Sequence, residues 1–177
     1  MHFATLDIYL SEADLSEASA LPVAFVARWL NVTPPAVKAM LARGDLSAVG
    51  IGSVQFVSAQ SLKTWHREME REVRKTRKVL SKAAKKGKPI SYSDLLTKLD
   101  RTYTNPADRR RIGRLLRAVS AQSHLEDGEL LAIWAYSKAT GLPKYGVWEI
   151  AEEQGWWAPG KDRAEFVEAM RSQTDTA

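Results

Sequence analysis

The sequence predicts a mainly α-helical fold with one short β-hairpin, divided between two small domains that a long basic helix connects. Three observations lead to this prediction. Apolar residues recur at helical spacing through most of the chain, a Gly-Ser pair separates two short β-type runs, and a block of positive charge lies in the middle. With 177 residues, of which 45% are hydrophobic and 27% charged, the chain has ordinary globular composition.

The N-terminal part of the chain predicts an extension followed by two short helices. Residues 1–20 form the extension, in which residues 3–10 suit a short strand, and we assign it no function. Residues 22–30 predict the first helix, with Pro22 in its first turn. Thr33 is suited to cap a second helix that starts at Pro34, runs to about residue 43 and ends at Gly44.

A hairpin and a long helix follow. Two β-type runs, residues 46–51 and 54–57, flank Gly52-Ser53, which favours a tight turn. Ser58 is suited to cap a helix over residues 58–87. Apolar residues on this helix recur at intervals of three, four or seven, which resembles a short coiled coil. We therefore expect a homodimer whose seam contains Leu62, Met69, Val73 and Leu80.

The remaining residues, 89–177, predict a second, small α+β domain, and Gly87-Lys88-Pro89 marks the expected boundary. Helices are expected over residues 91–99, from an Asn105 cap and Pro106 to about residue 122, and over 147–154 and 162–171. The apolar run at residues 130–136 predicts a buried strand, and residues 141–146 a loop.

The net charge of +5 conceals an uneven distribution. Residues 1–60 have a net charge of −2, residues 61–120 of +12, and residues 121–177 of −5. From Arg74 to Lys88 there are eight cations and no acid. Such an excess indicates a surface that binds phosphate groups rather than a solvated helix face with mixed charges.

The order helix, three-residue turn, helix, hairpin, long helix is the layout of a winged helix-turn-helix. Residues 21–66, with "WLNVTPPAVKAML", "RGDLSAVGIG" and "VQFVSAQSLKTW", resemble the excisionase/MerR-type winged helix-turn-helix DNA-binding domain. The resemblance implies that residues 33–43 form the recognition helix and residues 50–56 the wing. Relatives usually have arginines in the wing and several polar residues on the recognition helix. Here Pro35, Ala36 and Ala39 suit apolar contacts with thymine methyl groups instead.

The candidate DNA-contacting residues lie on the recognition helix, the wing, the long basic helix and the helix after Pro106. They are Thr33, Lys38, Arg43, Ser53, Arg67, Arg71, Arg74, Lys75, Arg77, Lys78, Arg110, Arg114 and Arg117. For the arginines between residues 109 and 117, salt bridges to the acidic C-terminal third are an equal alternative. If they contact DNA, the second domain is itself winged-helix-like.

Other function classes find little support in the sequence. The chain has no cysteine, its three histidines are isolated, and no glycine-rich phosphate motif is present, so we expect no enzyme, metal or cofactor. Glu126, Asp127 and Glu129 indicate a polar turn rather than a nuclease site. No apolar run approaches the roughly 18 residues of a membrane helix, and no signal peptide is evident, so a cytoplasmic, nucleoid-associated protein is expected.

These features together predict a double-stranded DNA-binding protein, either a transcriptional regulator or an excisionase-like factor of a bacterium or mobile element. Two alternatives remain open. The helix-turn-helix followed by "SAQSLKTWHREMEREVRK" also resembles a phage small terminase subunit, which would make the chain a DNA-packaging component. The same shape also suits a protein-interaction module, such as a mobile-element inhibitor, that does not bind DNA.

Overall fold

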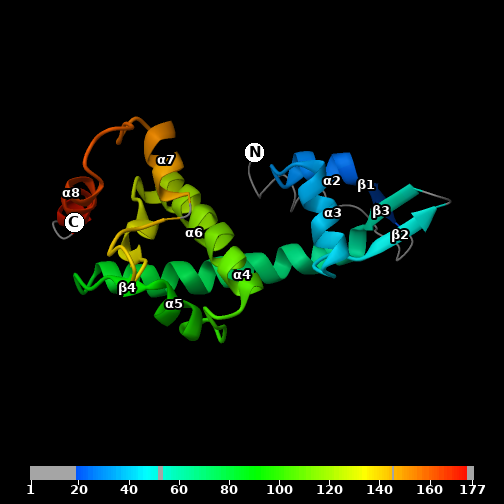
Figure 1. The fold of residues 1–177 in the computed structure, drawn as a ribbon, viewed down its shortest axis with the longest axis horizontal. Helices are drawn as coiled ribbons and strands as arrows, with labels where there is room; N and C mark the ends of the chain where they lie inside the picture. The colour runs from blue at the N-terminus through cyan, green and yellow to red at the C-terminus, as the bar shows by residue number, and fades with distance from the viewer. Residues whose placement is uncertain (1–18, 52–53, 145, 175–177) are drawn as a thin grey trace. The chain divides into compact units, whose positions relative to one another are not determined.

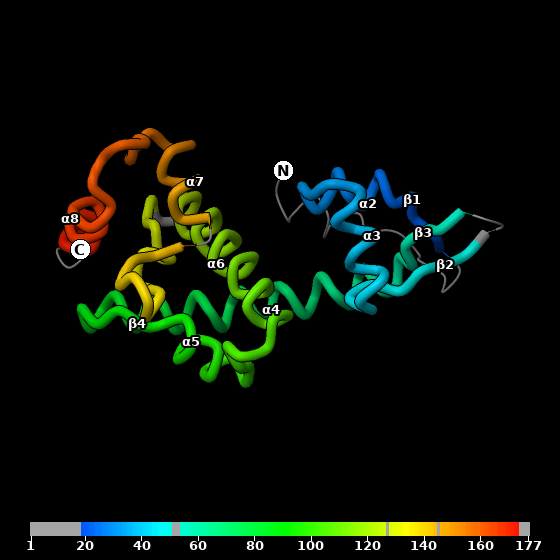
Figure 2. Tube along the Cα trace, viewed as in Figure 1, coloured from blue at the N-terminus to red at the C-terminus, as the bar shows by residue number. Residues whose placement is uncertain are grey.

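The structure, a computed structural model, describes residues 19–51, 54–144 and 146–174 (Figures 1 and 2). The described residues are mainly helical, as predicted, with a three-stranded antiparallel sheet and one two-stranded sheet. The strand expected at residues 3–10, the turn at Gly52-Ser53 and the candidate contact Ser53 lie outside the described residues.

The chain divides into two compact units, residues 1–69 and 70–177. The division falls inside the long helix α4 (Ala59–Ala84), earlier than the boundary that the sequence suggested at Gly87-Lys88-Pro89. The reason is that the C-terminal half of α4 contributes to the second unit. Its Val73 and Leu80 are buried, and its Glu72 forms ion pairs with Arg101 and Arg111.

The first unit contains β1 (Ala20–Pro22), α2 (Val23–Trp29), α3 (Pro34–Ala42), β2 (Ala48–Ile51), β3 (Val54–Ser58) and the start of α4. The two helices pack against each other, and the hairpin of β2 and β3 precedes α4 (Figure 1). These elements match the predicted helices and strands. The short strand β1 was not predicted; it pairs antiparallel with β3, so the sheet order is β1-β3-β2.

Local hydrogen bonds explain why the helices of the first unit begin and end where they do. The Thr33 hydroxyl accepts a hydrogen bond from the Ala36 amide at 3.4 Å and caps α3, as predicted. Gly44 follows α3 with a φ of +75°, a conformation that favours glycine. The Ser58 hydroxyl accepts from the Ser61 amide at 3.3 Å and caps α4. These caps fix the ends of both helices.

The second unit contains the rest of α4 and seven further elements. They are β4 (Ile90–Ser91), α5 (Tyr92–Lys98), α6 (Pro106–Asp127), the 3-10 helix η1 (Leu131–Trp134), β5 (Ala135–Tyr136), α7 (Val147–Glu153) and α8 (Arg163–Thr174). Ser91 and Asn105 cap α5 and α6, as predicted for Asn105, by accepting from the amides of Asp94 and Ala107. Asp162 accepts two amide hydrogen bonds at the start of α8.

The expected strand at residues 130–136 is wrong for most of its length. The segment forms η1 and then the two-residue strand β5, which pairs parallel with β4. All residues from Leu130 to Ala135 are buried, and a short apolar run of this kind does not distinguish a strand from another buried conformation. This parallel pairing is the strand pairing found among the described residues of the second unit. They show no antiparallel wing, so they do not support the winged-helix-like alternative.

The predicted dimer seam is occupied within a single chain. The exposed fractions of Leu62, Met69, Val73 and Leu80 are 0%, 2%, 8% and 0%. A coiled-coil seam would be exposed in an isolated protomer, so the expectation of a dimer through these residues is wrong. Among the described residues, no helix combines the length and the apolar character needed to cross a membrane.

Candidate nucleic-acid interface

The C-terminal half of α4 presents a one-sided row of cations. At about 100° per residue, Arg71, Arg74, Lys75, Lys78 and Lys82 fall within an arc of about 100°, and all five are exposed. They extend over about 16 Å of the helix axis. The opposite side of the helix contains Val73, Thr76 and Leu80, which are buried. We call the five exposed cations the basic face.

The basic face is not neutralised by neighbouring acids. None of its five side chains makes an ion pair within the part of the chain that the structure describes. Lys85, Lys86 and Lys88 follow at the end of α4 and are also exposed. Arg67, one turn earlier and within the first unit, is exposed as well. Uncompensated cations of this kind bind phosphate groups with a strong dependence on salt.

The carboxylate of Glu72, on the same stretch of α4, is directed to other partners. It accepts hydrogen bonds from Arg101 and Arg111, both at 2.5 Å, and Arg101 also binds Asp108 at 2.9 Å. Burial raises the pKa of Glu72, but the hydrogen bonds from the two guanidinium groups outweigh it and lower the pKa below the ordinary value. The negative charges of Glu72 and Asp108 are thus balanced by Arg101 and Arg111. Neither carboxylate forms an ion pair with a cation of the basic face.

The sequence did not indicate this four-residue network. Arg101 lies in a loop and Asp108 in the first turn of α6, and neither was a candidate functional residue. The acids and arginines of the network come from segments up to 39 residues apart. No local pattern identifies such partners.

Arg77, a predicted DNA contact, forms an ion pair within the second unit. Its guanidinium forms an ion pair with Glu126 of α6, and Glu126 also accepts a hydrogen bond from Gln122 at 3.1 Å. The hydrogen bond from Arg77 lowers the pKa of Glu126. The pair joins α6 to α4, which cross within the second unit (Figure 1). The predicted DNA contact of Arg77 stays a prediction, and its guanidinium is engaged by Glu126 in this structure.

The arginines of α6 do not form a second cationic row. Arg111 is bound to Glu72, and the guanidinium of Arg117 lies 3.8 Å from Glu153 of α7. The predicted salt bridge to the acidic C-terminal third is thus found for Arg117, whereas Arg111 has its partner on α4. Arg114 is half-buried. Arg110 is exposed and forms no ion pair within the described ranges.

In the first unit, α3 buries one side and exposes the other. Val37 and Met40 are buried, whereas Lys38 is exposed. The two other predicted contacts at its ends are occupied: Arg43 pairs with Asp45 at 2.8 Å, and the Thr33 hydroxyl caps the helix. Lys38 is therefore the predicted contact on α3 whose charge has no ion-pair partner among the described residues.

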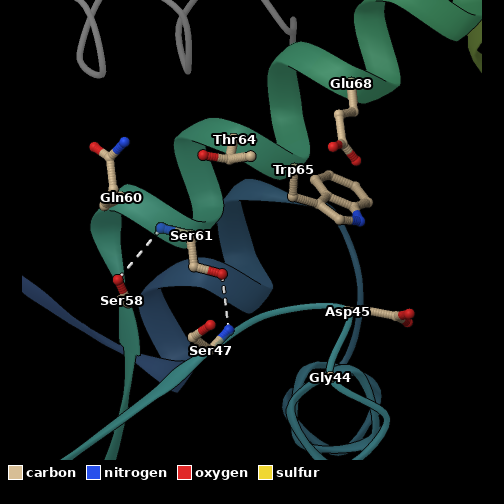
Figure 3. A pocket seen from close by; sticks show the side chains of 9 residues that line it. All are labelled: Gly44, Asp45, Ser47, Ser58, Gln60, Ser61, Thr64, Trp65 and Glu68. Atoms are coloured by element: carbon tan, nitrogen blue, oxygen red, sulfur yellow. Dashed lines mark hydrogen bonds between the residues drawn. The ribbon is translucent and has the colours of Figure 1, made fainter.

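A hollow of about 460 Å³ lies beside α3 and the start of α4 (Figure 3). Its lining includes Ser47, Ser58 and Ser61, and the Ser61 hydroxyl accepts a hydrogen bond from the Ser47 amide at 2.7 Å. Asp45 and Glu68 also line it. These are the two carboxylates in the described part of the first unit. The hollow is therefore unsuited to a phosphate group.

The charge of the first unit changes sign once its described residues are considered alone. They contain five Lys/Arg and two Asp/Glu, a net charge of +3. The negative net charge of the first third arises from four acids in residues 1–18. Within the described ranges, no group of three or more His, Asp or Glu is arranged to hold a metal ion.

No protein-family model matches the chain, and the searches of curated proteins and of solved structures found no significant match either.

Proposed function

We propose that this chain binds double-stranded DNA, with the basic face of α4 contacting phosphate groups and the first unit acting as a winged helix-turn-helix. The observation that carries the proposal is the row of five exposed cations without ion-pair partners among the described residues, opposite a fully buried side. Phosphate contacts supply most of the sequence-independent affinity for DNA. All five cations belong to one helix, α4, whose geometry places them on the same side of its axis.

Two features favour a duplex over a single strand. Single-strand binding combines cations with aromatic side chains on which bases stack. On α4 the one tryptophan, Trp65, is buried, and the basic face contains no aromatic residue. The order α2, α3, hairpin, α4 supports docking of α3 in a major groove, which single strands lack.

The biological role follows only from the resemblance of residues 21–66 to excisionase/MerR-type domains. It extends the proposal to a transcriptional regulator or an excisionase-like factor. A phage packaging component remains a rival proposal, distinguished by a large ring-shaped oligomer in light scattering. An interaction module that does not bind DNA is the other rival.

The test compares two triple variants with the same change in net charge. Arg74→Gln/Lys75→Gln/Lys78→Gln removes three cations of the basic face. Lys98→Gln/Lys144→Gln/Lys161→Gln removes three exposed cations of α5 and two C-terminal loops. Binding to a fluorescent duplex of about two helical turns is measured by anisotropy at several salt concentrations.

The basic-face variant is expected to bind at least tenfold more weakly at low salt. Its plot of log affinity against log salt is expected to be shallower by up to about 2.7 units, since each phosphate contact contributes about 0.9. The control variant should keep the slope of the original protein. The proposal fails if the original protein binds no duplex at low salt, or if both variants behave alike.

A further inference from the structure

The exposed side of α3 is unusual for a helix that reads DNA, because it is almost entirely apolar and small. At about 100° per residue, Pro35, Ala39 and Ala42 lie within an arc of about 60°, with Lys38 beside them. All four are exposed, and Val37 occupies the opposite, buried side. We call Pro35, Ala39 and Ala42 the apolar row.

Hydrogen-bonding side chains are missing from α3 except for Lys38. The helix from Pro34 to Ala42 contains no Arg, Asn, Gln, Asp, Glu, Ser or Thr. The polar residues at its two ends are occupied, because Thr33 caps the helix and Arg43 binds Asp45. Bidentate recognition of adenine, which needs Asn or Gln, is therefore not available from α3, and Lys38 is its one side chain that can donate hydrogen bonds to guanine.

One base presents an apolar group in the major groove. The C5-methyl group of thymine is read by contact with small apolar side chains, among them alanine. The apolar row extends over about 10 Å along the helix axis, which corresponds to three base-pair steps of about 3.4 Å. Small side chains also allow the helix to approach the floor of the groove closely.

We infer that α3 selects thymine-containing major-groove sequences by packing the apolar row of Pro35, Ala39 and Ala42 against C5-methyl groups. This inference rests on the proposed DNA binding and names the feature of DNA that is read. Lys38, at the edge of the row, contacts a neighbouring phosphate. Specificity thus comes from burial of methyl groups and affinity from cations.

The same face is poorly suited to a protein partner. Binding energy at protein interfaces comes mainly from large anchors such as Trp, Tyr and Arg. The apolar row offers none, and the described part of the first unit has a net charge of +3. Both observations favour a polyanion over a protein surface.

The test separates the methyl group from every other feature of the DNA. Duplexes bound by the full chain are first selected from a randomised pool. The preferred duplex is then compared with one in which uracil replaces thymine throughout the site, which removes only the methyl groups. We expect thymine enrichment in the selected site and an affinity loss of about fourfold per methyl group contacted. The salt dependence should be unchanged, because the phosphates are the same.

A protein variant gives the reciprocal test. Ala39→Ser places a hydroxyl in the apolar row, and Ala169→Ser makes the same change at an exposed position of α8. Ala39→Ser should reduce the preference for thymine over uracil while the salt slope remains, and Ala169→Ser should change neither. Circular dichroism confirms that both variants fold.

The outcomes distinguish the inference from the function on which it rests. Equal affinity for thymine and uracil duplexes, with salt-dependent binding of both, overturns the inference and leaves DNA binding in place. Binding to no duplex in the randomised pool overturns both the inference and the proposed DNA binding.

Discussion

Glu72 pairs with two of the arginines near the C-terminal half of α4. Its carboxylate accepts hydrogen bonds from Arg101 and Arg111, and its side chain is only 12% exposed. A largely buried carboxylate between two guanidinium groups stabilises the fold while it is ionised. Glu72 binds Arg101 and Arg111 within the second unit, whereas the cations of the basic face remain exposed and form no ion pair among the described residues.

Replacing Glu72 with glutamine is expected to lower the free energy of unfolding by about 2 kcal/mol, because two charge-assisted hydrogen bonds lose their ionised acceptor. Urea unfolding followed by circular dichroism at pH 7 measures the change. Glu70→Gln is the matched control, since Glu70 lies on the same helix and makes no ion pair within the described residues. An equal loss in both variants would show that the network does not stabilise the unit.

The stabilisation by Glu72 is also expected to depend on pH, which the same variants can test. Because the pKa of Glu72 is lower in the folded protein than its ordinary value of 4.5, its contribution is present above that value and disappears as the pH falls through the folded-state pKa. The difference in unfolding free energy between the original protein and Glu72→Gln should therefore be full at pH 7 and shrink as the pH falls below the ordinary value of 4.5. A difference that does not vary with pH would contradict the assignment.

At the scale of elements, the sequence predicted the features that depend on residues close together in the chain, such as helix caps. Thr33, Ser58 and Asn105 cap helices through hydrogen bonds to amides two or three residues away, so each cap is visible in a short stretch of sequence. The strand β1 was not predicted because its pairing joins Leu21 to Val57, and no local pattern contains both. Short sequence patterns do not reveal contacts between residues that are far apart in the chain.

At the candidate interface, too, the sequence showed the local features but not the partners that are distant in the chain. The excess of cations on α4 was visible in the sequence, and the structure shows which of them are exposed. Arg77 was expected to contact DNA, but its acidic partner Glu126 lies 49 residues away. The apolar repeat on α4 was expected to bind a second chain, because a/d spacing alone does not distinguish an intermolecular seam from an internal one. In both cases the sequence placed the residues on the correct helix but did not identify the groups of the same chain that they contact.

Leu80 tests whether the apolar side of α4 is an internal core. Leu80→Ala should lower the free energy of unfolding by about 2–5 kcal/mol through loss of buried contacts, with a urea midpoint independent of protein concentration. Leu125→Ala, at a position 62% exposed on α6, should change the midpoint little. A midpoint that rises with protein concentration would restore the dimer seam.

At the scale of the whole molecule, the described residues of both units have a net positive charge, whereas residues 1–18 have a net negative charge. The described residues of the first unit have a net charge of +3, and residues 70–174 contain 21 Lys/Arg against 14 Asp/Glu, a net charge of +7. Residues 1–18 contain four acids and no Lys or Arg. This segment therefore opposes the attraction of the rest of the chain for a polyanion.

Neutralising the four N-terminal acids should therefore tighten duplex binding at low salt. The changes are Asp7→Asn, Glu12→Gln, Asp14→Asn and Glu17→Gln, which raise the net charge from +5 to +9. At about 10 mM salt the screening length is about 30 Å, so these charges act on DNA wherever it is bound, whereas at 150 mM it falls to about 8 Å.

The matched control neutralises four exposed acids of α7 and α8. These are Glu149, Glu152, Glu165 and Glu168. If net charge governs the attraction, both variants bind more tightly than the original protein at 10 mM salt, and the gain fades in both by 150 mM, as anisotropy titrations at the two concentrations will show. A gain that persists at 150 mM in the N-terminal variant alone would mean that the segment acts at short range on the DNA-binding surface, and long-range repulsion would then be the wrong explanation.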